Sequence, residues 1–407
     1  MGRRELLIAL TMAIVFTIIT LLVRNRLYGH VVWHRTFTGP VIDVACEGGI
    51  IYILTSTLPE GQGNRLVCWS ANGEALWDYD LSQCSSGFPA DFSCLLVFDG
   101  NCYLAGRNEH TLVCIRDGIL TASETVDNDT SHLEMTQQGE IFRIRSGGGS
   151  NETGYSVHGS NLKLKREVTL RDLFRCYSVG EDGSFAYEGV DLGIESVPGD
   201  ETELLKFLDG NGTEVWRKSG DFNLAWNRMW LDHDRIIVVT KSGLKIFDLL
   251  GNQIADSPAE IDDWNSARLE SGNIVSPGNQ VWSPVHCWDH KGREVWQSDL
   301  LWDSVDEISC NGNKILFVEG DIVGYDQASW NALPESERKR ISGLREGTPE
   351  ALVWKQHLVC RDEAGVVLWE QAIPRGFGND WLYEIKNLDN EHCLVVNGSE
   401  MMVVRLD

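Results

Sequence analysis

The strongest constraint on the fold is a five-residue pattern, Gly-x-x-aliphatic-Trp, that recurs along the chain. Its copies are Gly29–Trp33, Gly73–Trp77, Gly212–Trp216, Gly292–Trp296 and Gly365–Trp369. Each later copy follows an apolar run and a turn residue, Asp or Ser, and forms the second half of a predicted hairpin. The first copy has no first half before it, whereas the chain ends in a first half, Met402–Asp407. Together the two ends would complete one hairpin, which predicts a ring of repeats closed by its termini.

A second repeated signal, a turn residue followed by an aliphatic or aromatic strand, alternates with the first. It begins at Gly49, Gly100, Gly139, Gly183, Asp234, Gly272, Gly312 and Asn390. Most intervals are about 40 to 50 residues, the period of a four-stranded propeller blade. Three units carry a degraded first signal: Gly118 leads to Ala122, Gly159 to Lys163 and Gly251 to Ala255. The sequence therefore predicts an all-β fold, an eight-bladed β-propeller whose eighth blade combines strands from both termini.

The interval between Gly312 and Asn390 is about twice the usual period. We interpret residues 320–350 as an insertion between two strands of blade seven rather than as a ninth blade. The run Pro334–Arg340 is typical of a short helix, so the insertion is expected to be partly helical.

The repeated residues have a structural explanation. The Asp or Ser side chain can cap the turn, and Gly can adopt a positive φ there. The Trp then lies at a fixed place on the outer strand, where its flat face can pack against the neighbouring blade. We expect this role, and not ligand binding, for the repeated tryptophans.

The N-terminal segment has the features of a membrane anchor. Leu6 to Val23 contains no charged residue and is flanked by Arg3, Arg4, Arg24 and Arg26. At 1.5 Å per residue it spans a hydrocarbon core of about 30 Å. We expect residues 1–26 to be an uncleaved single-span anchor, with a transmembrane helix at 6–23, and residues 27–407 to be the propeller. Arginines on both sides specify the orientation weakly; the expected location of the propeller is extracytoplasmic.

Charge and cysteine content limit the possible partners and cofactors. The net charge of −25 disfavours binding to nucleic acid or to anionic lipid. Eleven cysteines form no CxxC pair, and Cys68, Cys114, Cys287 and Cys360 occupy equivalent positions in four repeats. Equivalent positions lie on different blades, too far apart to share a disulfide or a metal ion. We therefore expect small buried core residues, no metal site and no cofactor.

The Asp-x-x-Gly-x-x-x-Trp units resemble those of the quinoprotein-like propeller superfamily, which includes pyrroloquinoline-quinone dehydrogenases and a lipoprotein of outer-membrane protein assembly. The resemblance covers residues 29–407 and is specific for the fold rather than for the function. The quinone-dependent dehydrogenases carry two adjacent cysteines over the cofactor, and this chain has no Cys-Cys pair. A quinone enzyme is therefore disfavoured. The shorter turns, such as Glu270–Ile274, also resemble the repeats of arylsulfotransferases.

Two functions follow from these observations. The first is a membrane-anchored, non-catalytic binding or scaffold module, in envelope or membrane-protein assembly, whose partner is another protein bound on a loop face. The loops expected to make the contact are the long ones between second and third strands, Thr57–Asn64, Glu188–Glu203 and Gly320–Glu350. The alternative is an arylsulfotransferase-like enzyme that uses His132, at the start of a predicted inner strand, as a nucleophile in the propeller funnel. The charged run Asp232–Arg235 lies at a predicted hairpin turn and is interpreted as solvated.

Overall fold

The computed structural model describes most of the ring. The described residues are 29–37, 39–56, 64–84, 92–106, 111–126, 130, 132–145, 153–170, 172–191, 202–220, 228–240, 242–258, 266–277, 284–298, 304–325, 352–373 and 384–406. The predicted anchor at residues 6–23 lies outside these ranges. Within them, no helix is long and apolar enough to cross a membrane.

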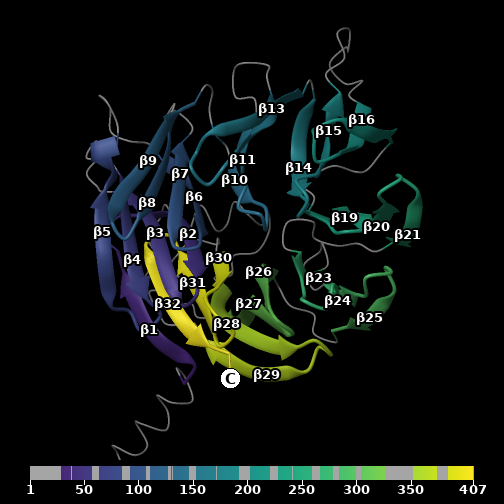
Figure 1. Cartoon of the computed structure of the whole chain (residues 1–407). Coiled ribbons are helices and arrows are strands. Elements are labelled where there is room, and N and C mark those ends of the chain that lie inside the picture. The colour runs from purple at the N-terminus through teal and green to yellow at the C-terminus, as the bar shows by residue number, and fades with distance from the viewer. Residues whose placement is uncertain are drawn as a thin grey trace, which may run out of the picture.

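Eight four-stranded antiparallel sheets surround a common centre (Figure 1). Blade one contains β2 to β5, and the numbering follows the chain to blade eight, which contains β30, β31, β32 and β1. The innermost strands are β2 (Val41–Glu47), β6 (Phe92–Phe98), β10 (His132–Met135), β14 (Leu173–Val179), β18 (Arg228–Leu231), β22 (Ala267–Arg268), β26 (Ser304–Asn311) and β30 (Glu384–Asn387). The predicted eight-bladed propeller is confirmed.

The second strands begin one or two residues after the eight turn residues of the second sequence signal. They are β3 (Ile50–Ser56), β7 (Asn101–Gly106), β11 (Ile141–Arg145), β15 (Phe185–Asp191), β19 (Arg235–Thr240), β23 (Ile274–Pro277), β27 (Lys314–Tyr325) and β31 (His392–Asn397). The third strands are β4 (Asn64–Ser70), β8 (Thr111–Arg116), β12 (Thr153–His158), β16 (Thr202–Leu208), β20 (Gly243–Asp248), β24 (Val285–Trp288), β28 (Leu352–Asp362) and β32 (Glu400–Arg405). Both sets are strongly buried where their side chains are described, because blades pack against them on both faces.

The outer strands carry the first sequence signal. They are β1 (Val31–Thr36), β5 (Ala75–Asp80), β9 (Ile119–Thr125), β13 (Leu164–Leu170), β17 (Glu214–Ser219), β21 (Gln253–Pro258), β25 (Glu294–Gln297) and β29 (Val367–Ala372). One 3-10 helix, η1 (Leu81–Cys84), follows β5. The core lies between adjacent blades: Tyr52 and Leu66 of blade one pack with Leu104 and Val113 of blade two.

The termini close the ring as the sequence predicts. Strand β1 pairs antiparallel with β32, with Val31 opposite Val404. The amide of Arg405 donates to the carbonyl of His30 at 2.7 Å, and the His30 ring stacks on Trp369 of blade seven with centroids 4.4 Å apart. Both ends of the chain therefore contribute to one hairpin and to the contact with the preceding blade.

The repeated tryptophans join neighbouring blades. Trp216 of blade four donates its indole N–H to the carbonyl of Leu249 in the blade-five turn, at 3.0 Å. In the same turn Gly251 has a φ of +85°, and a Cβ there would lie 3.0 Å from the indole. Trp33 and Trp296 make the same bond to the following blade, with lengths of 2.6 and 2.8 Å. The packing role predicted from the sequence is confirmed for these residues.

The degraded unit of blade three is aligned differently from the prediction. Leu162, with a φ of +65°, occupies the turn position that Gly has elsewhere. In blade four, the repeated Trp216 lies opposite Phe207 of the preceding strand. The equivalent position in blade three, opposite Val157, is taken by Arg166 and not by the predicted Lys163. A substitute contact joins blade two to this turn, since the Tyr103 hydroxyl donates to the carbonyl of Ser160 at 3.4 Å. The alignment was wrong because positive φ is rare for Leu and the sequence offers Gly159 nearby.

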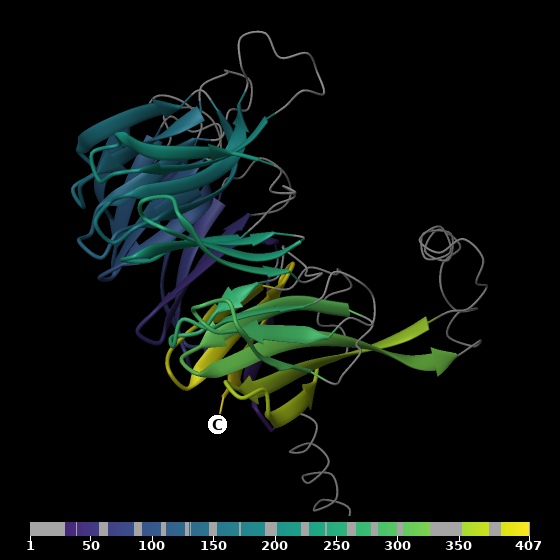
Figure 2. The ribbon, with the colours of Figure 1, turned by 90° about the vertical axis from the view of Figure 1, so that its right-hand side faces the viewer.

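The blade-seven insertion joins β27 and β28, the two longest strands, which pair from Lys314–Asp362 to Tyr325–Leu352. In Figure 2 this hairpin projects beyond the other strands of its blade. Residues 326–351, including the predicted helix, lie outside the described residues.

All eleven cysteines are described and free. Burial raises the pKa of the thiols of Cys68 and Cys287 to about 12. Cys68 lies opposite Trp77, Cys287 opposite Trp296, and Cys360 opposite Trp369, so these positions are equivalent, as the repeat predicts.

Candidate functional site

The two faces of the ring differ in their connections. In blades one to seven, the turn between the first and second strands and the turn between the third and fourth strands lie at the same end. In blade eight this end has the β30–β31 turn and the end of β32. We call this end the short-turn face. It also contains the start of β1, beside Leu406. Most connections on the opposite face lie outside the described residues.

The repeat makes the short-turn face acidic, because four repeats place a capping Asp there: Asp209, Asp248, Asp289 and Asp362. Asp289 shows the reason: its carboxylate accepts hydrogen bonds from the backbone amides of Lys291 and Arg293, both at 2.9 Å. Asp209 and Asp248 make equivalent bonds in their own turns. The repeat therefore contributes much of the negative charge of this face.

A hollow of about 600 Å³ opens on the short-turn face, between blades five to eight. Its walls come from Trp230 of β18, Arg268 of β22, and the first turns of blades six, seven and eight. The polar residues of those turns are Glu270, Asn311, Asn387, Asp389 and Asn390. The lining residues are far apart in the sequence, and closure of the ring brings them together.

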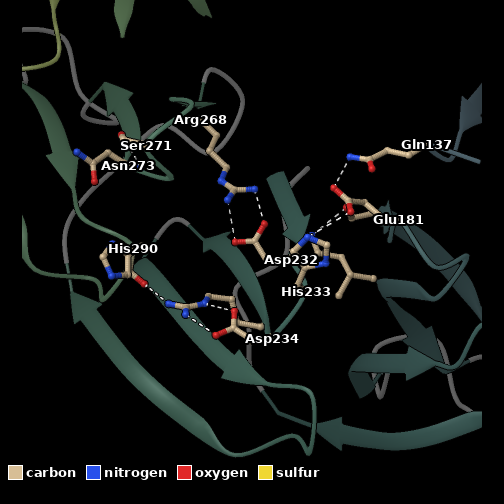
Figure 3. Close-up of polar contacts among 12 residues, drawn as sticks. Gln137, Glu181, Asp232, His233, Asp234, Arg268, Ser271, Asn273 and His290 are labelled. Carbon is tan, nitrogen blue, oxygen red and sulfur yellow. Dashed lines mark hydrogen bonds and ion pairs between the residues drawn. The ribbon is translucent and has the colours of Figure 1, made fainter. Parts of the chain in front are cut away.

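Arg268 is held by one carboxylate. Its two terminal nitrogens contact the two oxygens of Asp232 at 2.5 and 2.8 Å (Figure 3). This bidentate geometry fixes the guanidinium plane and cancels its charge locally. The Nε of Arg268 is buried and has no hydrogen-bond partner among the described residues.

Two other carboxylates border the hollow without such a cation. Glu270 is exposed and has no ion-pair partner among the residues that the structure describes. Asp389 accepts hydrogen bonds from the Glu391 amide at 2.8 Å and the His392 ring at 2.9 Å. The hollow therefore has an excess of negative charge at its rim.

Two asparagines fix the shape of the rim. Asn387 of blade eight donates to the carbonyl of Cys310 in blade seven at 2.5 Å. Asn311 of blade seven donates in return to the carbonyl of Asp389 at 2.6 Å. These reciprocal bonds hold the two turns in register, so the hollow exists before any ligand arrives.

A smaller hollow of about 190 Å³ lies beside the first, between blades four and five. Arg268 and Asp232 belong to its lining, together with Glu181 and His233. Figure 3 shows Glu181 between Gln137 and His233, at 2.5 and 3.2 Å. Polar contacts thus continue along this face from blade three to blade six.

The run Asp232–Arg235 lies in the β18–β19 turn, as predicted, but its side chains are engaged rather than simply solvated. Asp232 binds Arg268 of the next blade, and Arg235 pairs with Asp234 and donates to the carbonyl of His290 at 2.8 Å. Arg268 and His290 belong to the next repeat, whereas Asp234 is adjacent to Arg235 in the same turn. The contacts that join this turn to blade six therefore have no local sequence signal.

His132 lies on the innermost strand of blade three, where the sequence placed it. Its side chain is 55% exposed, with a Glu134 oxygen 3.9 Å away and the Tyr177 ring at a centroid distance of 6.0 Å. Its pKa is lowered by burial on its protein-facing side and by the positive charge of Lys386 on blade eight. His132 is not part of the hollow on the short-turn face.

Carboxyl groups dominate the inner strands near these residues. Burial raises the pKa of Glu134 to about 7. Burial also raises the pKa of Asp43 to about 6, although the carboxylate accepts a hydrogen bond from the Leu95 amide at 2.7 Å. Lys386 contacts Glu384 at 2.6 Å. No group of three or more His, Cys, Asp or Glu side chains within the described ranges could hold a metal ion.

Neither protein-family models nor curated proteins match this chain. Several solved structures do. BamB from Moraxella catarrhalis is similar with a TM-score of 0.55 and 11% identity, over 92% of this chain and 99% of that one. Sqt1 from Saccharomyces cerevisiae gives a TM-score of 0.54 and 8% identity, over 92% and 98%.

Quinohemoprotein alcohol dehydrogenase from Comamonas testosteroni gives a TM-score of 0.51 and 10% identity, over 92% of this chain and 76% of that one. At such low identities these similarities define the fold alone. The chain therefore shares the β-propeller fold of these three proteins.

Proposed function

We propose that this chain is a membrane-anchored scaffold that binds another protein on the short-turn face and catalyses no reaction itself. The observation that supports this most is the preformed hollow of about 600 Å³, built by turns of blades six, seven and eight and by Trp230 of blade five. Preformed concave sites with a few fixed polar groups are typical of binding surfaces. By resemblance to its fold relatives, a role in envelope or membrane-protein assembly is proposed.

The membrane part of the proposal rests on residues 6–23 and on the position of β1. This strand enters the ring beside Leu406, at the rim of the short-turn face, because the His30 carbonyl binds the Arg405 amide. A transmembrane anchor would therefore hold this face toward the bilayer. We propose an extracytoplasmic propeller, which a reporter fused to the C-terminus would test.

Site-specific photo-crosslinking tests the binding function. A photoreactive amino acid replaces Asn390, an exposed residue of the hollow, in the full chain in its native membranes. The control position is Ile119, which is 65% exposed on the outer strand of blade two. A single protein crosslinked at Asn390 and absent at Ile119 is the expected result. No adduct, or the same adducts at both positions, would contradict the proposal.

The second candidate function is sulfuryl transfer at His132. One observation favours it: Lys386 is close enough to influence the His132 pKa and could attract a sulfate group. Against it, Glu134, Asp43 and Glu384 outnumber that cation, and an anionic donor would be repelled. An aryl sulfate donor with a phenol acceptor, assayed with native protein and His132→Ala, decides between them. Turnover that is lost in His132→Ala would establish the enzyme.

A further inference from the structure

We propose that the hollow on the short-turn face accepts a lysine or arginine side chain of the partner protein. This inference rests on the proposed binding function and specifies its recognition chemistry. It combines three properties of the hollow: uncompensated negative charge, an aromatic wall and a fixed polar rim.

The charge of the lining favours a cation. The formal charges of the charged lining residues are +1 for Arg268 and −1 each for Glu270 and Asp389. Both terminal nitrogens of Arg268 are already bound to Asp232, so that cation is neutralised by its own partner. The Glu270 carboxylate has no ion-pair partner among the described residues, so it is available to pair with an ammonium or guanidinium group. Asp389 is already bound by the Glu391 amide and the His392 ring, and it adds negative charge beside that position.

The same arrangement disfavours an anionic ligand. A phosphate or carboxylate would need Arg268 to leave Asp232, because the bidentate pair uses the guanidinium edge that anions prefer. It would also approach Glu270 and a face on which the capping Asp residues repeat. The field of a chain with a net charge of −25 therefore attracts cations toward the hollow and repels anions.

Trp230 supplies a second element of cation recognition. It is half-buried, lines the hollow, and packs against the core of blades five and six that contains Ile237 and Trp288. An indole face held in place by such packing attracts a cation within about 6 Å of the ring. Aromatic contact also accommodates the aliphatic stem of Lys or Arg.

The fixed rim limits the ordering that binding requires. The reciprocal bonds of Asn311 and Asn387 already connect the turns of blades seven and eight. Preformed walls reduce the entropy lost on binding, so one inserted side chain can contribute measurably to affinity.

The test measures binding of a fluorescent peptide with alternating Gly and Lys to the full chain in detergent, by anisotropy at low and moderate salt. The matched probe has every Lys acetylated. Trp230→Leu and Glu270→Gln should each weaken binding about fivefold to tenfold, whereas Trp230→Phe should retain most of it.

Asp117→Asn is the charge control. Asp117 is exposed on the same face in blade two, and its φ of +52° suits Asn. We expect less than about a twofold effect, because a distant exposed charge is screened beyond about 10 Å. Glu270→Gln removes no hydrogen bond described within the ring, so it separates recognition from folding if Trp230→Leu is unstable.

Equal binding of the acetylated peptide, or equal weakening by Glu270→Gln and Asp117→Asn, would overturn the inference. The proposed function can fail separately. A specific adduct at Asn390 that Glu270→Gln leaves unchanged would refute the basic side chain but not the binding role. No adduct at Asn390 would refute the binding role itself.

Discussion

Removal of residues 403–407 should open the ring and unfold much of it. Val403, Val404 and Leu406 are at most 1% exposed, and burial of each such side chain contributes about 1.5 to 3 kcal/mol. The truncation also removes the bonds from Arg405 to His30 and from Leu406 to Glu391. The expected loss of roughly 5 to 9 kcal/mol approaches the whole stability of a typical protein, about 5 to 15 kcal/mol.

Thermal and urea unfolding of the full chain, followed by circular dichroism and tryptophan fluorescence, measures this loss. Val32→Ala is the matched control, because Val32 lies on β1 of the same closing strand pair but is 43% exposed. It should change the free energy of unfolding by about 0.5 kcal/mol or less. A truncated chain whose melting temperature stays within about 5 °C of the intact chain would refute the closure by β1 and β32.

Three further predictions follow from the blade contacts and the buried groups. Gly251→Ala should lower the free energy of unfolding, measured in denaturant, more than Gly100→Ala does. Both glycines have positive φ, but only a Cβ at Gly251 would contact the Trp216 ring, so equal effects would refute this contact. Because the folded pKa of Glu134 is about 7, above its ordinary 4.5, stability should fall as pH rises from about 4.5 to 7. Glu134→Gln should reduce the change in unfolding free energy between about pH 4.5 and 7, and an unchanged slope would contradict the assignment of this pH dependence to Glu134. Cys287, with a thiol pKa near 12, should resist alkylation at pH 8 until denaturant is added, as mass spectrometry can show; rapid labelling of the folded chain would contradict its burial.

The sequence predicts the ring well because its signals are local and repeated. A turn Gly, a capping Asp and a Trp at fixed spacing are sufficient to place strands within each blade. The first copy of the five-residue pattern, Gly29–Trp33, has no preceding strand and therefore predicts closure of the ring by the termini, which the pairing of β1 with β32 confirms. The blade-three alignment fails where Leu162 takes the positive φ that the sequence would assign to Gly.

The candidate site is harder to predict because it depends on distances between repeats. Trp230, Arg268, Asn311 and Asp389 belong to four blades, and none forms a motif with its sequence neighbours. The sequence alone predicts a solvated Asp232, because its partner Arg268 is one repeat away. The sequence predicts the position of His132 on an inner strand, which β10 confirms, but residue spacing does not reveal the nearby Tyr177 ring or the charge of Lys386.

Hydrogen exchange of the chain with and without its crosslinked partner tests the central proposal most directly. We predict slower amide exchange in the first turns of blades six, seven and eight, around Glu270, Gly312 and Asp389, when the partner is bound. The equivalent turns of blades one and two, around Gly48 and Asp99, should exchange unchanged. Protection that spares Glu270, Gly312 and Asp389 and appears only on the opposite face would contradict binding at the short-turn hollow.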